Sequence, residues 1–128
     1  MLKLFGEIEE REVFNQKLNA VKNLIYEICD KLLDNNNVVL DFGFWTKQER
    51  NELKQRFSKY NVTLIYNKID DKIILDRINK RNSNLKENEY FMDEATFKFL
   101  SSLFEEPDET EEVIIYKNNE QLSKDLKF

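Results

Sequence analysis

The chain has 128 residues, of which 20 are basic and 25 acidic, so its formal net charge is −5. Hydrophobic residues make up 41% and charged residues 35%, which is typical of one globular domain. No apolar run approaches the roughly 18 residues of a membrane span, and the first residues show no signal-peptide pattern. We therefore expect a single cytoplasmic domain over residues 1–128. The excess of acid argues against a nucleic-acid partner, and the missing span against a membrane partner.

Several residue types that often carry chemistry are scarce. The sequence has no histidine, one cysteine at Cys29, and two glycines at Gly6 and Gly43. This excludes a disulfide framework, a zinc site built from Cys and His, and a mechanism with a His base. Two isolated glycines also cannot form a glycine-rich phosphate-binding loop. Cys29 is interpreted as a small buried hydrophobe rather than a reactive thiol.

The first predicted element is a helix over residues 7–33. Its apolar side chains recur at spacings of three and four residues, which defines one stripe of an amphipathic helix. The stripe consists of Phe14, Leu18, Val21, Ile25, Ile28 and Leu32. We expect it to pack on a sheet, and the three asparagines at 35–37 to end the helix.

A strand is predicted over residues 38–44, followed at once by a helix. The run is nearly continuously apolar and rich in β-branched and aromatic residues, which suits a strand covered on both faces. Thr46 and Glu49 then match a capping box, so a second helix is expected over 47–60. Later elements follow in this order: a strand over 62–66, a helix capped by Asp70 or Asp71, a polar loop over 82–89, a helix capped by Asp93, and a strand over 113–116.

Buried strands that alternate with helices predict an α/β fold, with a three-layer parallel sheet and flanking helices. Ligands of open parallel sheets bind outside the carboxyl ends of the strands. Asp41 lies near such an end, where its carboxylate could face a magnesium ion or another ligand. The alternative is that Asp41 accepts hydrogen bonds from nearby amides and organises the turn. Both interpretations stay open at this point.

Arg77 and Arg81 lie four residues apart, on one face of the third helix. Two guanidinium groups there could clamp a phosphate. The alternative is a solvated face on which Asp76 pairs with Lys80.

Trp45 could stack on a ligand or belong to the core, and Arg50 could point toward the same crevice or lie on the surface. Six acidic residues surround Pro107 and are interpreted as a solvated loop rather than a weak cation site. These are Glu105, Glu106, Asp108, Glu109, Glu111 and Glu112.

Residues 38–50 read Val-Val-Leu-Asp-Phe-Gly-Phe-Trp-Thr-Lys-Gln-Glu-Arg. This block resembles the middle of AAA-type P-loop kinase-like ATP-binding proteins, the group related to zeta toxin and chloramphenicol phosphotransferase. In that group a buried strand ends in an aspartate, and an aromatic-rich turn leads into a Ser/Thr-x-x-Glu-Arg helix. Residues 75–82 are similar to the lid entry of the group, and residues 104–109 to a further signature.

The resemblance implies roles for five residues. Asp41 would take a Walker-B-like catalytic position beside the magnesium ion of Mg-ATP. Arg81 would be the lid arginine that approaches the phosphates and takes part in catalysis, and Arg77 a weaker cofactor-binding candidate. Trp45 and Arg50 would line the acceptor side and bind substrate. A metal-binding carboxylate and phosphate-binding arginines suit phosphoryl transfer.

The sequence departs from this group in one respect. It holds no Gly-x-x-x-x-Gly-Lys-Ser/Thr loop and no segment for an acceptor-activating aspartate. The resemblance therefore implies a truncated P-loop kinase-like fold, a remnant or split part of an ATP-dependent phosphotransferase. It would be inactive alone and would bind Mg-ATP weakly. Its partner would be a polypeptide that supplies the missing P-loop strand, or a second copy.

Three further expectations follow. Within one monomer, we expect the strands over 38–44 and 62–66 to pair directly. The alternative function is a non-enzymatic α/β protein-interaction module. An independent magnesium-dependent enzyme is less favoured, because Asp41 and the acidic loop have no visible base or nucleophile partner.

Overall fold

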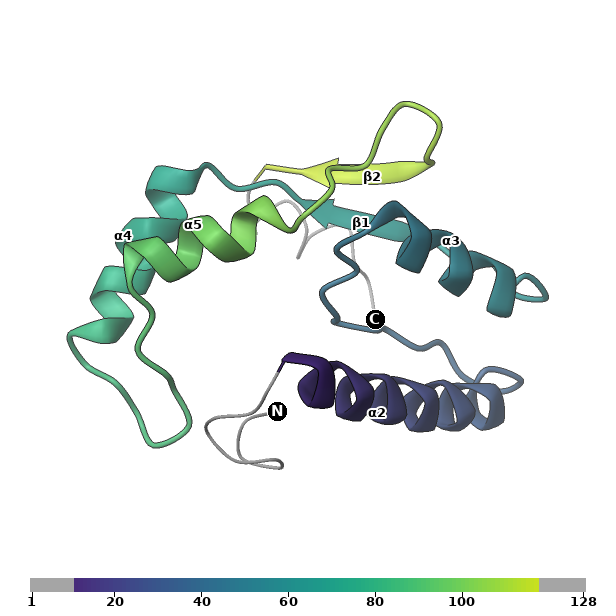
Figure 1. Ribbon diagram of the computed structural model, residues 1–128. Helices are drawn as coiled ribbons and strands as arrows, with labels where there is room; N and C mark the ends of the chain where they lie inside the picture. Colours follow the sequence, from purple (N-terminus) through teal and green to yellow (C-terminus); the bar gives the residue numbers. More distant parts are fainter. Residues whose placement is uncertain (1–10, 118–128) are drawn as a thin grey trace. The chain divides into compact units, whose positions relative to one another are not determined.

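The computed structural model describes residues 11–117 (Figure 1). The chain divides into two compact units, Met1–Phe42 and Gly43–Phe128, which are described separately. The prediction of one truncated domain over 1–128 stays a prediction. The helices and strands are α2 (Arg11–Leu32), α3 (Lys47–Arg56), β1 (Leu64–Asn67), α4 (Asp71–Asn82), α5 (Glu94–Ser102) and β2 (Val113–Tyr116). None of the helices within 11–117 is long and apolar enough to cross a bilayer.

The first unit contains α2, which confirms the predicted helix from Arg11 onward; residues 7–10 of that prediction lie outside the described range. Cys29 is 3% exposed, as expected for a small buried hydrophobe. The predicted stripe is wrong at its carboxyl end, where Ile28 and Leu32 are exposed. The covered positions there are Ile25 of the stripe together with Cys29 and Leu33, which widen the stripe on one side. Packing of α2 on a sheet stays a prediction.

Residues 38–44 do not form a strand, which corrects the sequence-based prediction. Val39 is 63% exposed despite its high β-propensity. A strand persists only where a neighbour completes its backbone hydrogen bonds. Among the described residues, β1 pairs with β2 and with no other strand. The expected direct pairing of 38–44 with 62–66 is therefore also wrong.

The second unit holds a small parallel sheet of β1 and β2, and so has mixed α/β character. Their register places Leu64 opposite Val113 and Asn67 opposite Tyr116. The ladder continues for one more bond, in which the Lys68 amide donates to the Tyr116 carbonyl at 2.7 Å. The connection between the strands carries α4 and α5, as parallel strands require a long crossover. The predicted strands over 62–66 and 113–116 are thus confirmed as elements.

The core of the second unit is small. Its buried apolar side chains among the described residues come from α3 and its cap, the two strands and α4. They are Leu53, Phe57, Leu64, Ile78 and Tyr116. The rings of Tyr66 and Phe104 add a tilted contact, with centroids 5.4 Å apart.

The helix starts follow the predicted caps. Thr46 Oγ1 accepts from the Glu49 amide at 3.1 Å, and Glu49 Oε2 accepts from the Thr46 amide at 3.1 Å, which confirms the capping box. Asp70 accepts from the Lys72 amide at 2.8 Å and Asp93 from the Thr96 amide at 2.7 Å. The α3 helix ends at Arg56, four residues earlier than predicted, with Phe57 as its C-cap.

Candidate functional site

Asp41 lies in the irregular segment between α2 and α3, and its side chain is exposed. Because no strand forms over 38–44, Asp41 does not stand at the carboxyl end of a strand in this structure. Its predicted position in a sheet-edge site is therefore not observed. Its predicted role as a magnesium ligand stays a prediction.

The basic face of α4 divides into two parts. Arg77 is exposed, and beside it Lys80 pairs with Asp76 at 2.9 Å, as the solvated-face alternative predicts. Arg81 is half-buried and turns toward the loop that follows α4. Its Nη2 donates weakly to the Tyr90 carbonyl at 3.4 Å, while its buried Nε has no acceptor among residues 11–117. Arg81 thus keeps a buried donor without an acceptor among the described residues, whereas Arg77 is exposed to solvent.

Asn82 fixes the loop that follows α4. Its side-chain amide donates to the Met92 carbonyl at 2.6 Å, and its side-chain oxygen accepts from the Met92 amide at 3.1 Å. Together with the Arg81 contact at Tyr90, this closes residues 83–91 into a loop anchored at both ends. No local sequence pattern predicts these two bonds, because Asn82 and Met92 lie ten positions apart.

Trp45 folds back over Gly43. A β-carbon placed on Gly43 would overlap the indole Nε1 and lie 2.5 Å from Cδ1. The close approach explains why glycine stands at this position. The indole is half-buried and lies against the Gly43 backbone. Its stacking on a ligand stays a prediction.

Arg50 is not a surface residue, which corrects that alternative. Its side chain is 4% exposed and forms an ion pair with Glu111, whose side chain is 2% exposed. Nε donates to Glu111 Oε1 at 2.7 Å, Nη2 to Oε2 at 3.0 Å, and Nη1 to the Phe44 carbonyl at 3.0 Å. Hydrogen bonding to Glu111 raises the pKa of Arg50, and the same bond lowers the pKa of Glu111. The predicted contact of Arg50 with an acceptor stays a prediction.

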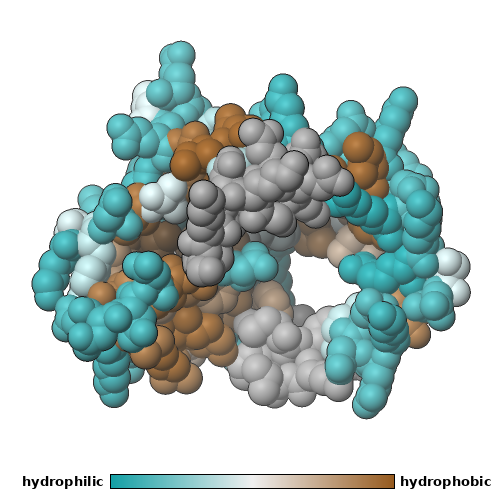
Figure 2. All heavy atoms as spheres, turned by 180° about the vertical axis from the view of Figure 1, so that it is seen from behind, coloured by the Kyte–Doolittle hydropathy of each residue, from teal (hydrophilic) through white to brown (hydrophobic). Residues whose placement is uncertain are grey.

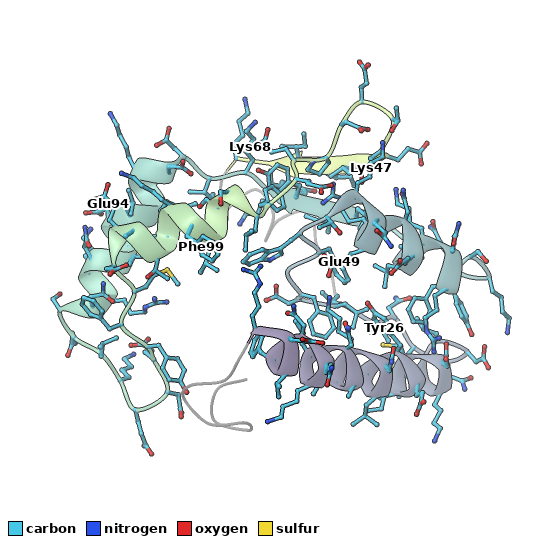
Figure 3. All side chains as sticks on the ribbon, viewed as in Figure 1. Tyr26, Lys47, Glu49, Lys68, Glu94 and Phe99 are labelled. Atoms are coloured by element: carbon cyan, nitrogen blue, oxygen red, sulfur yellow. The ribbon has the colours of Figure 1, made fainter. Side chains whose placement is uncertain are left out.

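We call residues 105–111 the acidic strap, because they bind the start of α3. The Glu105 amide donates to the Trp45 carbonyl at 2.7 Å, and Glu105 Oε2 accepts from the Lys47 amide at 3.0 Å. A carboxylate at this position stabilises α3, because its negative charge interacts favourably with the positive end of the helix dipole. Lys47, labelled in Figure 3, extends from the first turn of α3 and pairs with Asp108 at 2.6 Å. Glu105 and Asp108 are exposed, as expected for a solvated loop, although both contact the start of α3. The expectation is wrong for Glu111, whose side chain is 2% exposed.

Glu106 faces the strand side of the strap. It accepts from the Tyr66 hydroxyl at 3.1 Å and pairs with Lys68 at 3.2 Å. Burial and this hydrogen bond raise the pKa of Tyr66 to about 12. Four acidic residues of the strap thus have partners within the second unit: Glu105, Glu106, Asp108 and Glu111.

The acidic residues do not form a magnesium site by themselves. Within residues 11–117, no group of three or more His, Cys, Asp or Glu side chains is arranged to hold a metal ion. Asp41 could supply one carboxylate oxygen, whereas magnesium in nucleotide sites takes its remaining ligands from phosphates and water. The described residues therefore do not fit a complete Mg-ATP site, and no step through that group is derived.

The parallel strands β1 and β2 with their helical crossover are an α/β arrangement. A family model described as "AAA domain" matches residues 2–107. Because the match covers most of the chain, the protein belongs to this AAA domain family, which lies in the P-loop kinase-like superfamily. No curated protein and no solved structure matches the chain. The match ends before Glu111 and β2.

Proposed function

We propose that this chain is a remnant or split part of an ATP-dependent phosphotransferase and is inactive by itself. One observation carries the proposal: an AAA domain match over residues 2–107 in a sequence without a Gly-x-x-x-x-Gly-Lys-Ser/Thr loop. Such a loop supplies the backbone amides and the lysine that hold the nucleotide phosphates. Without them, tight binding of Mg-ATP has no physical basis. The likeness to zeta toxin and chloramphenicol phosphotransferase belongs to this proposal as well.

The residue roles rest on the resemblance of residues 38–50 and 75–82 to the kinase-like group, and the structure adds an observation for Arg81. Arg81 has a buried Nε without an acceptor among the described residues, which suits it to bind a phosphate oxygen. Arg77 is exposed on the same helix and is the second phosphate candidate. Asp41 is proposed as the metal ligand. Trp45 is proposed as the substrate-side residue, with Arg50 holding the backbone that carries it.

The proposed partner is a polypeptide that supplies a P-loop strand, rather than a second copy. A P-loop follows a strand, and that strand requires a parallel neighbour. The described sheet has two strands, fewer than independent stability requires. Ile65, Ile114 and Ile115 of this sheet stay exposed, and Figure 2 shows apolar surface between hydrophilic residues on one face. An added strand would extend the sheet toward the expected three-layer arrangement.

Calorimetric titration of the chain with Mg-ATP tests the proposal. We expect a dissociation constant weaker than about 1 mM, which corresponds to less than about 4 kcal/mol of binding free energy. A constant near 1 μM, or about 8 kcal/mol, would contradict the proposed inactivity. Light scattering in the same buffer distinguishes a monomer from self-association, which would favour the second copy as partner.

A non-enzymatic protein-interaction module is the second candidate. Large apolar side chains exposed on α5 and its preceding loop favour it, with Phe91 and Phe99 the most exposed; Phe99 is labelled on α5 in Figure 3. The genomic neighbourhood discriminates between the two candidates. An adjacent reading frame that encodes a strand, a P-loop and a helix would support the phosphotransferase, and its absence the module.

A further inference from the structure

We infer that the Arg50–Glu111 ion pair is a lock that holds the acidic strap on the start of α3, and thereby positions both the Gly43–Trp45 turn and strand β2. Neither sequence motifs nor the family match assign a partner to Arg50, and Glu111 lies beyond the matched residues. The inference starts from the burial of both charges.

The lock is more buried than four other ion pairs of the described residues, Lys47–Asp108, Lys68–Glu106, Lys80–Asp76 and Lys98–Glu94, whose side chains are 39–76% exposed. Lys80–Asp76 and Lys98–Glu94 join residues four apart on one helix, and their side chains are 63–76% exposed. Exposed pairs of this kind contribute little. Arg50 and Glu111 are 61 positions apart and nearly fully buried. A buried charge is tolerated only while its partner remains in place, so removal of either side chain disrupts the arrangement.

On one side, the lock determines the backbone before α3. Arg50 Nη1 donates to the Phe44 carbonyl, and the Glu105 amide of the strap donates to the next carbonyl, that of Trp45. These two bonds fix the turn in which the indole lies over Gly43. If the strap moves away, the Trp45 carbonyl loses the Glu105 donor, and Arg50 loses the carboxylate that holds its guanidinium against the Phe44 carbonyl.

On the other side, the lock determines where β2 begins. Glu111 lies two residues before Val113, the first residue of β2, and also accepts from the Asp108 amide at 3.2 Å. Val113 pairs with Leu64 at the start of the ladder. Strand β2 has four residues and one described neighbour, so few backbone hydrogen bonds hold it in the sheet. Its pairing therefore depends on how the residues just before Val113 are anchored.

The lock can be tested without nucleotide. Trp45 is the one tryptophan of the sequence, so its emission reports the turn directly. Glu111→Gln keeps the size of the side chain but leaves the Arg50 charge without its counterpart. Glu112→Gln removes the same charge from the exposed neighbour and is the matched control. Arg50→Lys keeps the charge but loses the planar fork and the Phe44 bond. The measurements are Trp45 emission and amide hydrogen exchange.

We expect Glu111→Gln to shift the Trp45 emission and to accelerate exchange in residues 113–116 by at least about tenfold, with α4 unchanged. Arg50→Lys should give a smaller change of the same kind, and Glu112→Gln none. Unchanged emission and exchange in Glu111→Gln, or equal acceleration throughout the chain, would overturn the inference.

A measurement on the unmodified chain covers the case in which Glu111→Gln does not fold. The Arg50 Nε–H is buried and donates to a carboxylate, whereas Arg77 is exposed. By nuclear magnetic resonance, we expect Arg50 Nε–H to exchange at least about tenfold more slowly than Arg77 Nε–H. Equal rates would show that the lock is open in solution and would overturn the inference. Since neither test uses ATP, the outcome is independent of the proposed phosphotransferase.

Discussion

Asn82 and Met92 are joined by two hydrogen bonds of opposite direction, one donated by the side-chain amide and one accepted by the side-chain oxygen. The Asn82 side chain thus pairs with both the carbonyl and the amide of Met92, as the backbone of a neighbouring β-strand would. These two bonds close the loop between α4 and α5. The same loop contains Tyr90, whose carbonyl accepts a hydrogen bond from Arg81. The mobility of this loop therefore depends on one side chain.

Asn82→Ala should lower the free energy of unfolding by about 1–3 kcal/mol, because it removes both hydrogen bonds to the Met92 backbone and each bond has a modest net contribution. Urea unfolding measures the change, and amide exchange at Met92 localises it. Asn84→Ala, in the same loop and exposed, is the control. An equal loss in both variants would show that the loop bonds contribute nothing specific.

Gly43→Ala should destabilise the second unit by about 1–3 kcal/mol, since the new methyl group overlaps the indole of Trp45. In a Trp45→Ala background the same substitution should cost much less. Urea unfolding of the two single variants and the double variant forms a thermodynamic cycle. Additive effects would contradict the close approach of Gly43 and Trp45.

The two arginines of the candidate site should respond differently to truncation. Arg50→Ala leaves Glu111 buried without its partner and should cost about 3–5 kcal/mol. Arg81→Ala removes one weak hydrogen bond and should change the free energy of unfolding by no more than about 0.5 kcal/mol. Chemical denaturation measures both. A loss of several kcal/mol for Arg81→Ala would make it a structural residue and weaken its proposed role at phosphates.

Asp108 should contribute to acid sensitivity. Hydrogen bonds from Lys47 and Thr110 lower its pKa from 3.8 to about 2. A carboxyl group with a depressed pKa in the folded state stabilises the fold above its unfolded pKa and loses that contribution as the pH falls. The loss therefore occurs between about pH 4 and pH 2. Thermal unfolding of Asp108→Asn should show a weaker pH dependence in this window than Glu109→Gln, and identical profiles would contradict the assignment.

Core truncation should identify the face of α3 that stabilises the fold. Leu53→Ala should cost about 2–5 kcal/mol, because the side chain is buried beside Phe57. Gln55→Ala, on the exposed side of the same helix, should be close to neutral. Urea unfolding compares the two. Similar values would mean that α3 does not pack through its Leu53 face.

Part of the candidate site could be read from the sequence, and part could not. The pairing of Asp76 with Lys80 was predictable because the two residues are four apart on one helix, and the burial of Cys29 because cysteine is among the residue types most often buried. The pairing of Arg50 with Glu111, of Asn82 with Met92 and of Lys47 with Asp108 was not predictable, because these partners lie ten or more positions apart. The acidic residues at 105–112 predict a negatively charged segment. They do not indicate which of these residues form ion pairs with a lysine or an arginine.

The sequence by itself determined the helices and where they begin, since the caps at Thr46, Asp70 and Asp93 bind amides two or three residues ahead. Only the tertiary structure decided which apolar runs become strands. The runs at 64–67 and 113–116 found each other in parallel register, whereas 38–44, equally suited by composition, formed no ladder. A helix satisfies its backbone hydrogen bonds internally, but a strand requires a second segment, and local sequence does not specify whether that segment is present.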